Sequence, residues 1–186
     1  LTDEFNDAVP RMVRAGRAPR AILLYALKSV AEEPRLFAPG TAFDYSNTNY
    51  LLAQLVLEQA TGNPMRTVFH EWVFDPARLE NTSVLGFGNS TMVASFENLG
   101  EGPVVVNSFH TGFGFGDGGL VATAADVAGF YRSLFVRRDL LTEESLELLL
   151  LDPLTEGYGL GVEVERFSDG TIVVGHAGEH IGFSSD

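Results

Sequence analysis

The spacing of apolar residues changes once along this 186-residue chain, and that change limits the possible folds most strongly. Up to about residue 155 the apolar residues recur mainly at helical intervals, whereas beyond Gly157 they alternate with polar ones. The alternation predicts strands over residues 158–167 and 171–176, joined by the turn sequence Ser-Asp-Gly at 168–170. Helices followed by an antiparallel hairpin indicate an α+β fold.

Start and stop signals divide the first 155 residues into helical segments separated by loops. Asn63 with Pro64 is expected to be the N-cap and first residue of a short helix, and Thr123 and Thr142 are expected to cap two later ones. Gly62 suits the position after a helix end. The predicted helices span 19–33, 48–61, 64–72, 124–135 and 143–150. Residues 81–112 are expected to be loop with brief strands. The predicted buried face of the second helix comprises Tyr50, Leu51, Leu55 and Val56, with Leu52 as a further candidate.

Charge and composition exclude several kinds of partner. The chain has 12 basic and 25 acidic residues, a net charge of −13, which would repel a nucleic acid or an anionic membrane surface. It has no cysteine, so disulfides, thiolate metal sites and a cysteine nucleophile are excluded. No apolar run approaches 18 residues, and no membrane span is therefore expected. A small-molecule or peptide substrate remains as the expected partner.

The first candidate for chemistry is the segment 39–50, which places Tyr45 and Asn47 at the start of a predicted helix. A phenol titrates near pH 10, and positive neighbours could lower its pKa enough for it to move protons. Asn47 offers both a donor and an acceptor, which suits a substrate amide. An ordinary helix cap beside a packed aromatic residue fits the same pattern.

The second candidate is the segment 171–185, in which a predicted strand leads to His176, Ala177 and Gly178. Small residues allow a substrate backbone to approach the strand edge closely. The amide N–H groups after Gly178 could face a developing oxyanion. A strand that ends in a solvated histidine is the alternative interpretation.

Two other motifs suggest cofactors that we do not expect. The sequence from His176 to His180 fits the zinc pattern His-x-x-Glu-His, but that pattern needs a helix, and the β-branched residues before it predict a strand. The glycines between Gly114 and Gly119 imitate a dinucleotide fingerprint without its preceding strand or its partner acid. Neither a metal nor an organic cofactor is therefore expected.

Together, the two candidate segments resemble the second and third motifs of the penicillin-recognising serine hydrolases, the superfamily of class C β-lactamases, D-alanyl-D-alanine carboxypeptidases and related esterases. The residues 45–47 are similar to its Tyr-x-Asn motif, and 176–178 to its Lys/His-Thr/Ser/x-Gly motif. The resemblance extends from about Ala21 onward. Further matching stretches are Pro39-Gly-Thr-x-Phe, Gly118-Gly-Leu-Val-Ala-Thr-Ala-Ala-Asp, Tyr158-Gly-Leu-Gly and Gly175-His-x-Gly-x-x-x-Gly-Phe-Ser.

The resemblance implies a partial β-lactamase/transpeptidase-like fold, with a helical domain and part of an antiparallel sheet. Residues 1–186 are then a single partial domain, mainly helical over 1–155, with the hairpin and third-motif strand in 156–186. The family's nucleophile is the serine of Ser-x-x-Lys, which this sequence lacks, because its one lysine, Lys28, has Tyr25 three residues before it. We expect the nucleophile to precede Leu1 in a longer chain, and the isolated chain to be inactive.

By the same resemblance, the protein is a serine hydrolase that forms an acyl-enzyme from an amide or an ester. Tyr45 would relay the proton, and Asn47 would hold the acyl-side amide of the substrate. His176 would supply a donor or a positive charge near the leaving group, and Glu179 would give its backbone N–H to the oxyanion hole. Ala177 and Gly178 would line the substrate.

Ala177 departs from the family pattern, since it lacks the hydroxyl that helps many members bind a substrate carboxylate. This weakens the case for a D-Ala-D-Ala peptide or a β-lactam as the substrate and leaves room for an esterase or a D-aminopeptidase. The residues do not separate a carboxypeptidase, an esterase and an aminopeptidase. The alternative function is that of a non-catalytic relative that has lost the nucleophile and binds peptides or cell-wall pieces. A cell-wall enzyme would be exported, and an esterase cytoplasmic. The oligomeric state stays open.

Overall fold

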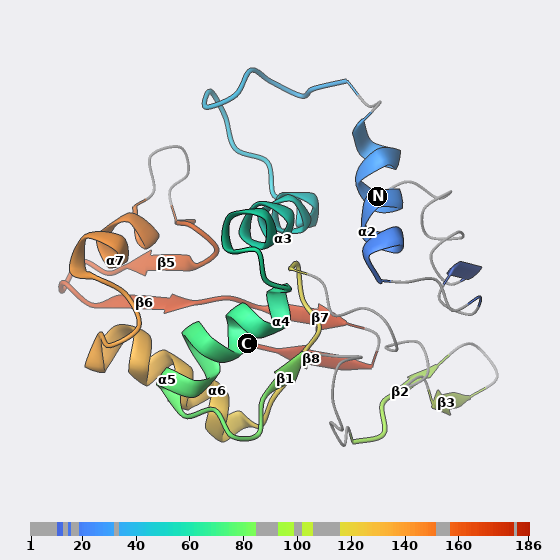
Figure 1. Cartoon of the computed structure of the whole chain (residues 1–186). Coiled ribbons are helices and arrows are strands. Elements are labelled where there is room, and N and C mark those ends of the chain that lie inside the picture. The colour runs from blue at the N-terminus through green and yellow to red at the C-terminus, as the bar shows by residue number, and fades with distance from the viewer. Residues whose placement is uncertain are drawn as a thin grey trace.

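The chain folds into helices in its N-terminal and central parts and short antiparallel strand pairs (Figure 1). The computed structural model describes residues 11–12, 15, 19–31, 34–84, 93–98, 102–105, 116–151, 157–180 and 182–186. The expected α+β class is confirmed. The predicted helix end at Glu33 and much of the glycine-rich stretch before Gly116 lie outside the described residues. Within the described part, no helix has the length and apolarity needed to cross a bilayer.

The first helix pair consists of α2 (Pro19–Ala31) and α3 (Asn47–Thr61), which pack through Ile22, Leu23 and Leu51. The start of α3 follows the prediction within one residue, because the Ser46 side chain accepts a hydrogen bond from the backbone N–H of Thr48. Its end also follows, with Gly62 in the left-handed conformation at φ +70°.

The predicted buried face of α3 is partly wrong. Leu52 and Val56 are 48% and 68% exposed, whereas the polar Gln54 is buried. Gln54 is satisfied there, because its side-chain oxygen accepts from the Gly116 N–H and its amide donates to Glu58. Apolar spacing alone could not identify a polar residue as part of the buried face.

The next helical segment is longer than predicted. It comprises α4 (Met65–Phe69), a π-helical turn η1 (His70–Phe74) and α5 (Asp75–Ala77). Its start was also assigned wrongly. Pro64 is the cap, the Asn63 side chain bonds to Thr61 instead, and the Glu58 carboxylate accepts from the Met65 N–H at 3.1 Å. The side chain that accepts from the first N–H of α4 thus belongs to the preceding helix.

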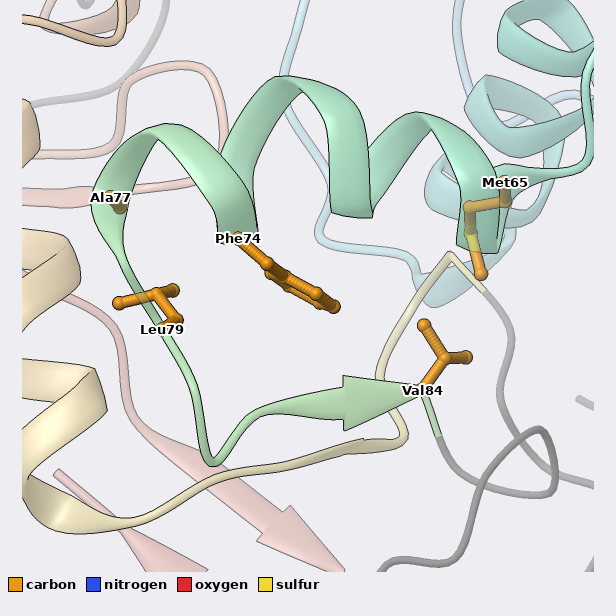
Figure 2. Packing of buried hydrophobic residues seen from close by; sticks show 5 residues of the cluster. All are labelled: Met65, Phe74, Ala77, Leu79 and Val84. Carbon is orange, nitrogen blue, oxygen red and sulfur yellow. The ribbon is translucent and has the colours of Figure 1, made fainter.

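A compact apolar cluster lies beneath this segment, and Figure 2 shows its buried members. Strand β1 (Ser83–Val84) pairs with β4 (Leu120–Val121) beside the cluster, so that Val84 is buried. A separate strand pair consists of β2 (Phe96–Asn98) and β3 (Pro103–Val105). The buried residues of the cluster are Met65, Phe74, Ala77, Leu79 and Val84.

Two later helices begin as predicted. Thr123 precedes α6 (Ala124–Tyr131), and Thr142 precedes α7 (Glu143–Leu149). Each threonine side chain accepts a hydrogen bond from a backbone N–H three residues on, at 3.2 Å. A second π-helical segment, η3 (Arg132–Arg137), continues α6.

The C-terminal part contains two consecutive hairpins. Strands β5 (Glu163–Arg166) and β6 (Ile172–Gly175) form the predicted one, and β6 leads directly to β7 (Gly178–His180), which pairs with β8 (Phe183–Ser185) (Figure 1). The predicted start at residue 158 is wrong, since Tyr158 makes only an isolated bridge to Glu163. Residues 157–161 form a turn that precedes β5.

Candidate active site

Three aromatic side chains from separate segments meet in the structure, and we call them the aromatic cluster: Tyr45, Tyr158 and His176. Tyr45 precedes α3, Tyr158 lies in the 157–161 turn, and His176 follows β6. The ring centroids of Tyr45 and His176 are 6.1 Å apart, and those of Tyr158 lie 5.9 Å from Tyr45 and 5.8 Å from His176. The structure thus brings the two predicted motifs to one place.

The start of α3 positions Tyr45. Ser46 is the N-cap and has an extended backbone, with φ −150° and ψ 124°, so the helix begins two residues after Tyr45. The Tyr45 side chain is 51% exposed, and Asn47, the first helical residue, is also exposed. Both side chains are therefore accessible to a ligand while their backbone is fixed by the helix start.

Polar contacts hold both nitrogens of the His176 ring. Tyr158 Oη lies 2.9 Å from Nε2, and Nδ1 makes a short contact with the carbonyl oxygen of Ala177. A carbonyl oxygen only accepts, so an Nδ1–H would satisfy this contact. In the neutral imidazole, Nε2 then accepts from the Tyr158 hydroxyl.

Tyr158 is held in its protonated form. Burial raises the pKa of its phenol above the ordinary value, and the neighbouring ionisable groups of Tyr50, Tyr45 and Glu163 add to the rise. The Phe43 ring packs against Tyr158 at 5.3 Å between centroids. This hydroxyl therefore remains available as a hydrogen-bond donor at neutral pH.

One face of α3 organises the surroundings of the aromatic cluster. Tyr50, Gln54 and Glu58 are spaced four residues apart and so project from the same side of the helix. Each contacts another segment: Tyr50 lies beside Tyr158 and Gly161, Gln54 hydrogen-bonds with Gly116, and Glu58 with the start of α4. The helix that presents Tyr45 therefore also fixes the turn that presents Tyr158.

The predicted oxyanion donor lies on β7. His180 and Phe183 close a hairpin with a two-residue connection, and such a closing pair is hydrogen-bonded. The next pair, Glu179 and Ser184, is therefore a non-hydrogen-bonded pair, which directs the Glu179 N–H away from β8. In the described part of the chain, β7 pairs only with β8, so this N–H takes no part in the β7–β8 ladder.

Sequence reasoning missed two residues of this region. Tyr50 was assigned to a buried helix face, and Tyr158 was predicted to begin a strand and a family-like Tyr-Gly-Leu-Gly stretch, with no role in the site. Its glycines were the available signal: a side chain at Gly161 would meet the Tyr50 hydroxyl at 2.6 Å, and Gly161 has a φ of +84°. Such glycines indicate a close approach between segments.

The residues that match the zinc motif adopt a different secondary structure from the helix that the motif requires. Glu179 and His180 lie in β7, so the sequence from His176 to His180 does not form the helix that the motif requires. No group of three or more histidine, aspartate or glutamate side chains suited to a metal occurs among the residues that the structure describes.

Comparison with known proteins gives consistent matches. The Beta-lactamase family model matches residues 4–185. Over 157 residues the chain is 29% identical to a D-aminopeptidase of Cereibacter sphaeroides, covering 79% of this chain and 29% of that protein. A solved D-stereospecific amidohydrolase from Streptomyces sp. has a TM-score of 0.65 at 29% identity, with 80% of this chain and 46% of that chain covered.

A further structural match is the octameric penicillin-binding protein homologue of Pyrococcus abyssi. Its TM-score is 0.71 at 22% identity, and the match covers 87% of this chain and 38% of that one. At this identity the similarity concerns the fold alone. The chain spans less than half the length of each of these three proteins.

Proposed function

This chain belongs to the Beta-lactamase family, and we propose that it supplies part of the active site of a serine hydrolase that cleaves an amide or ester through an acyl-enzyme. The observation that carries the proposal is the approach of Tyr45 and His176 to 6.1 Å between ring centroids. The sequence contains no Ser-x-x-Lys, so the proposed nucleophile comes from outside residues 1–186.

The proposed reaction has two stages. In the first, the serine oxygen bonds to the substrate carbonyl carbon, the serine proton passes through Tyr45 to the leaving amine or alcohol, and the scissile bond breaks. In the second, the oxygen of a water molecule bonds to the acyl carbon, a proton of that water passes to the serine oxygen, the acyl–serine ester bond breaks and the carboxylic acid leaves. The Glu179 N–H, directed away from β8, would stabilise the oxyanion in both stages.

A substrate with a D-amino acid on its acyl side is the class we favour. The relatives of about 29% identity are a D-aminopeptidase and a D-stereospecific amidohydrolase. Ala177 lacks a hydroxyl with which to bind a carboxylate on the leaving group. A net charge of −13 would also attract a substrate that carries a free ammonium group.

The test uses the full-length protein that contains this chain. D-amino acid p-nitroanilides should be hydrolysed faster than their L-counterparts. Tyr45→Phe should lower kcat by about 10²- to 10⁴-fold, the usual value of general acid–base catalysis. Tyr131→Phe removes the same oxygen from a tyrosine that packs on Phe130 and Phe135, and it should leave kcat unchanged.

An unchanged kcat in Tyr45→Phe would refute the role of this phenol. Absence of turnover together with measurable binding of the same compounds would favour a non-catalytic relative. Labelling by a fluorescent penicillin, with no hydrolysis of D-amino acid amides, would move the substrate class to β-lactams and cell-wall peptides.

A further inference from the structure

We propose that Tyr158 is a positioning residue that holds the His176 imidazole against Tyr45 through a hydrogen bond from its hydroxyl to Nε2. The inference rests on the proposed function for its effect on catalysis, but its structural part concerns this chain alone. The distance of 2.9 Å between Oη and Nε2 is the observation that carries it.

The position of His176 explains why such a residue is needed. His176 lies between β6 and β7, outside both strands, so no ladder of backbone hydrogen bonds fixes the orientation of its ring. The contact of Nδ1 with the neighbouring Ala177 carbonyl is local and permits the ring to swing with its own backbone. The bond to Tyr158 ties the ring to a different segment of the fold.

Tyr158 is itself held from several sides. Phe43 packs against its ring at 5.3 Å, and Tyr45 meets it edge-on at 5.9 Å. Tyr50, on α3, lies close enough to Tyr158 to raise its pKa. Because α3 also presents Tyr45, the sequence of contacts Tyr50–Tyr158–His176 sets the imidazole relative to the proposed proton-relaying phenol.

A hydroxyl suits this task better than a group that can donate a hydrogen bond but cannot accept one. It donates to Nε2 of a neutral imidazole and accepts from Nε2–H of an imidazolium, so the bond survives a change in the charge of His176. The phenol is protonated at neutral pH and so has both abilities, and its raised pKa extends this state to higher pH. A phenylalanine would keep the packing and lose the bond in both states.

The kinetic test compares Tyr158→Phe with Tyr131→Phe in the full-length protein. We expect Tyr158→Phe to lower kcat at least about tenfold, with KM changed less than about twofold and a displaced pH–rate profile, because small misplacements of active-site groups are costly. Tyr131→Phe should change none of these. In a His176→Gln background the effect of Tyr158→Phe should disappear, since a positioning residue acts through its partner. An equal loss in both backgrounds, or none in either, would overturn the proposal.

A second measurement does not depend on turnover. Histidine-selective ¹⁵N labelling of the wild type, with His176→Gln to identify the signal, should show the neutral imidazole of His176 protonated on Nδ1. In Tyr158→Phe this tautomer preference should weaken. A wild-type imidazole protonated on Nε2 would refute the geometry whatever the catalytic result. Correct tautomers in a protein without hydrolase activity would refute the proposed function and leave the positioning contact intact.

Discussion

At the scale of single residues, the aromatic cluster depends on one glycine that bears no chemistry. Gly161 combines a φ of +84° with a close approach to Tyr50, whose hydroxyl lies 2.6 Å from the place a Cβ would take. The left-handed region costs an L-residue about 1–2 kcal/mol. Steric overlap with the Tyr50 phenol would destabilise the protein further, because it would displace the side chain that lies beside Tyr158.

Gly161→Ala should therefore lower both stability and activity. Gly170 offers a matched control, since its φ is +87° and nothing lies within 4 Å of its would-be Cβ. Gly170→Ala should lower the free energy of unfolding only by the cost of a left-handed backbone, about 1–2 kcal/mol, and leave kcat near the wild-type value. Thermal melting and kcat of both variants, measured side by side, check this. Equal effects of the two substitutions would contradict the contact with Tyr50.

At the scale of elements, the start of α6 depends on a buried carboxylate. Asp126 accepts hydrogen bonds from the Asn81 N–H at 2.7 Å and the Thr82 hydroxyl at 2.8 Å. Burial raises its pKa, but the hydrogen bonds from Thr82 and Asn81 outweigh burial, and the net shift is downward. These bonds join α6 to the chain just before β1.

Asp126→Ala should destabilise the protein by about 1–3 kcal/mol, because two donors then lack their partner. The folded-state pKa lies below the ordinary value of about 3.9, so the stabilisation is fully present above about pH 4 and is lost as the pH falls through the lowered pKa. Urea unfolding at pH 7 and at about pH 3 should show the difference from wild type shrinking in acid.

Asp139→Asn is the control for charge removal. Its ion pair with Arg137 is 2.8 Å long but almost half exposed on both sides, so its loss should cost less than about 1 kcal/mol. If Asp126→Ala were no more destabilising than this exposed substitution, the buried network would not have the role assigned to it.

The elements also show how far sequence reasoning reaches. The caps Ser46, Thr123 and Thr142 act over two or three residues, and the two threonine caps and the Gly62 terminus were predicted from local sequence. The Glu58 cap on α4 and the burial of Gln54 were not, because their partners lie on other elements. Residues 158–161 of the turn were predicted as strand, since period-two alternation cannot reveal where glycines bend the chain.

At the scale of the whole molecule, the fold expected from the motif resemblance is confirmed. Its structural neighbours are β-lactamase/transpeptidase-like, and the chain is a partial example of that fold. The segments that resemble the family motifs were enough to predict the fold, because several matches in the same order as in the family are rarely due to chance. The site was only partly predictable. Tyr45 and His176 were proposed from the motifs, whereas the place of Tyr158 beside both of them follows from packing across three segments.

The most direct measurement is to locate the acyl group. The full-length protein, treated briefly with an activated ester of a D-amino acid, should gain the mass of the acyl group on one serine. Peptide mapping should place that serine in a Ser-x-x-Lys sequence outside residues 1–186, and the isolated chain should gain no mass. An acyl group on a serine within residues 1–186, or hydrolysis with no acylated serine, would contradict the account.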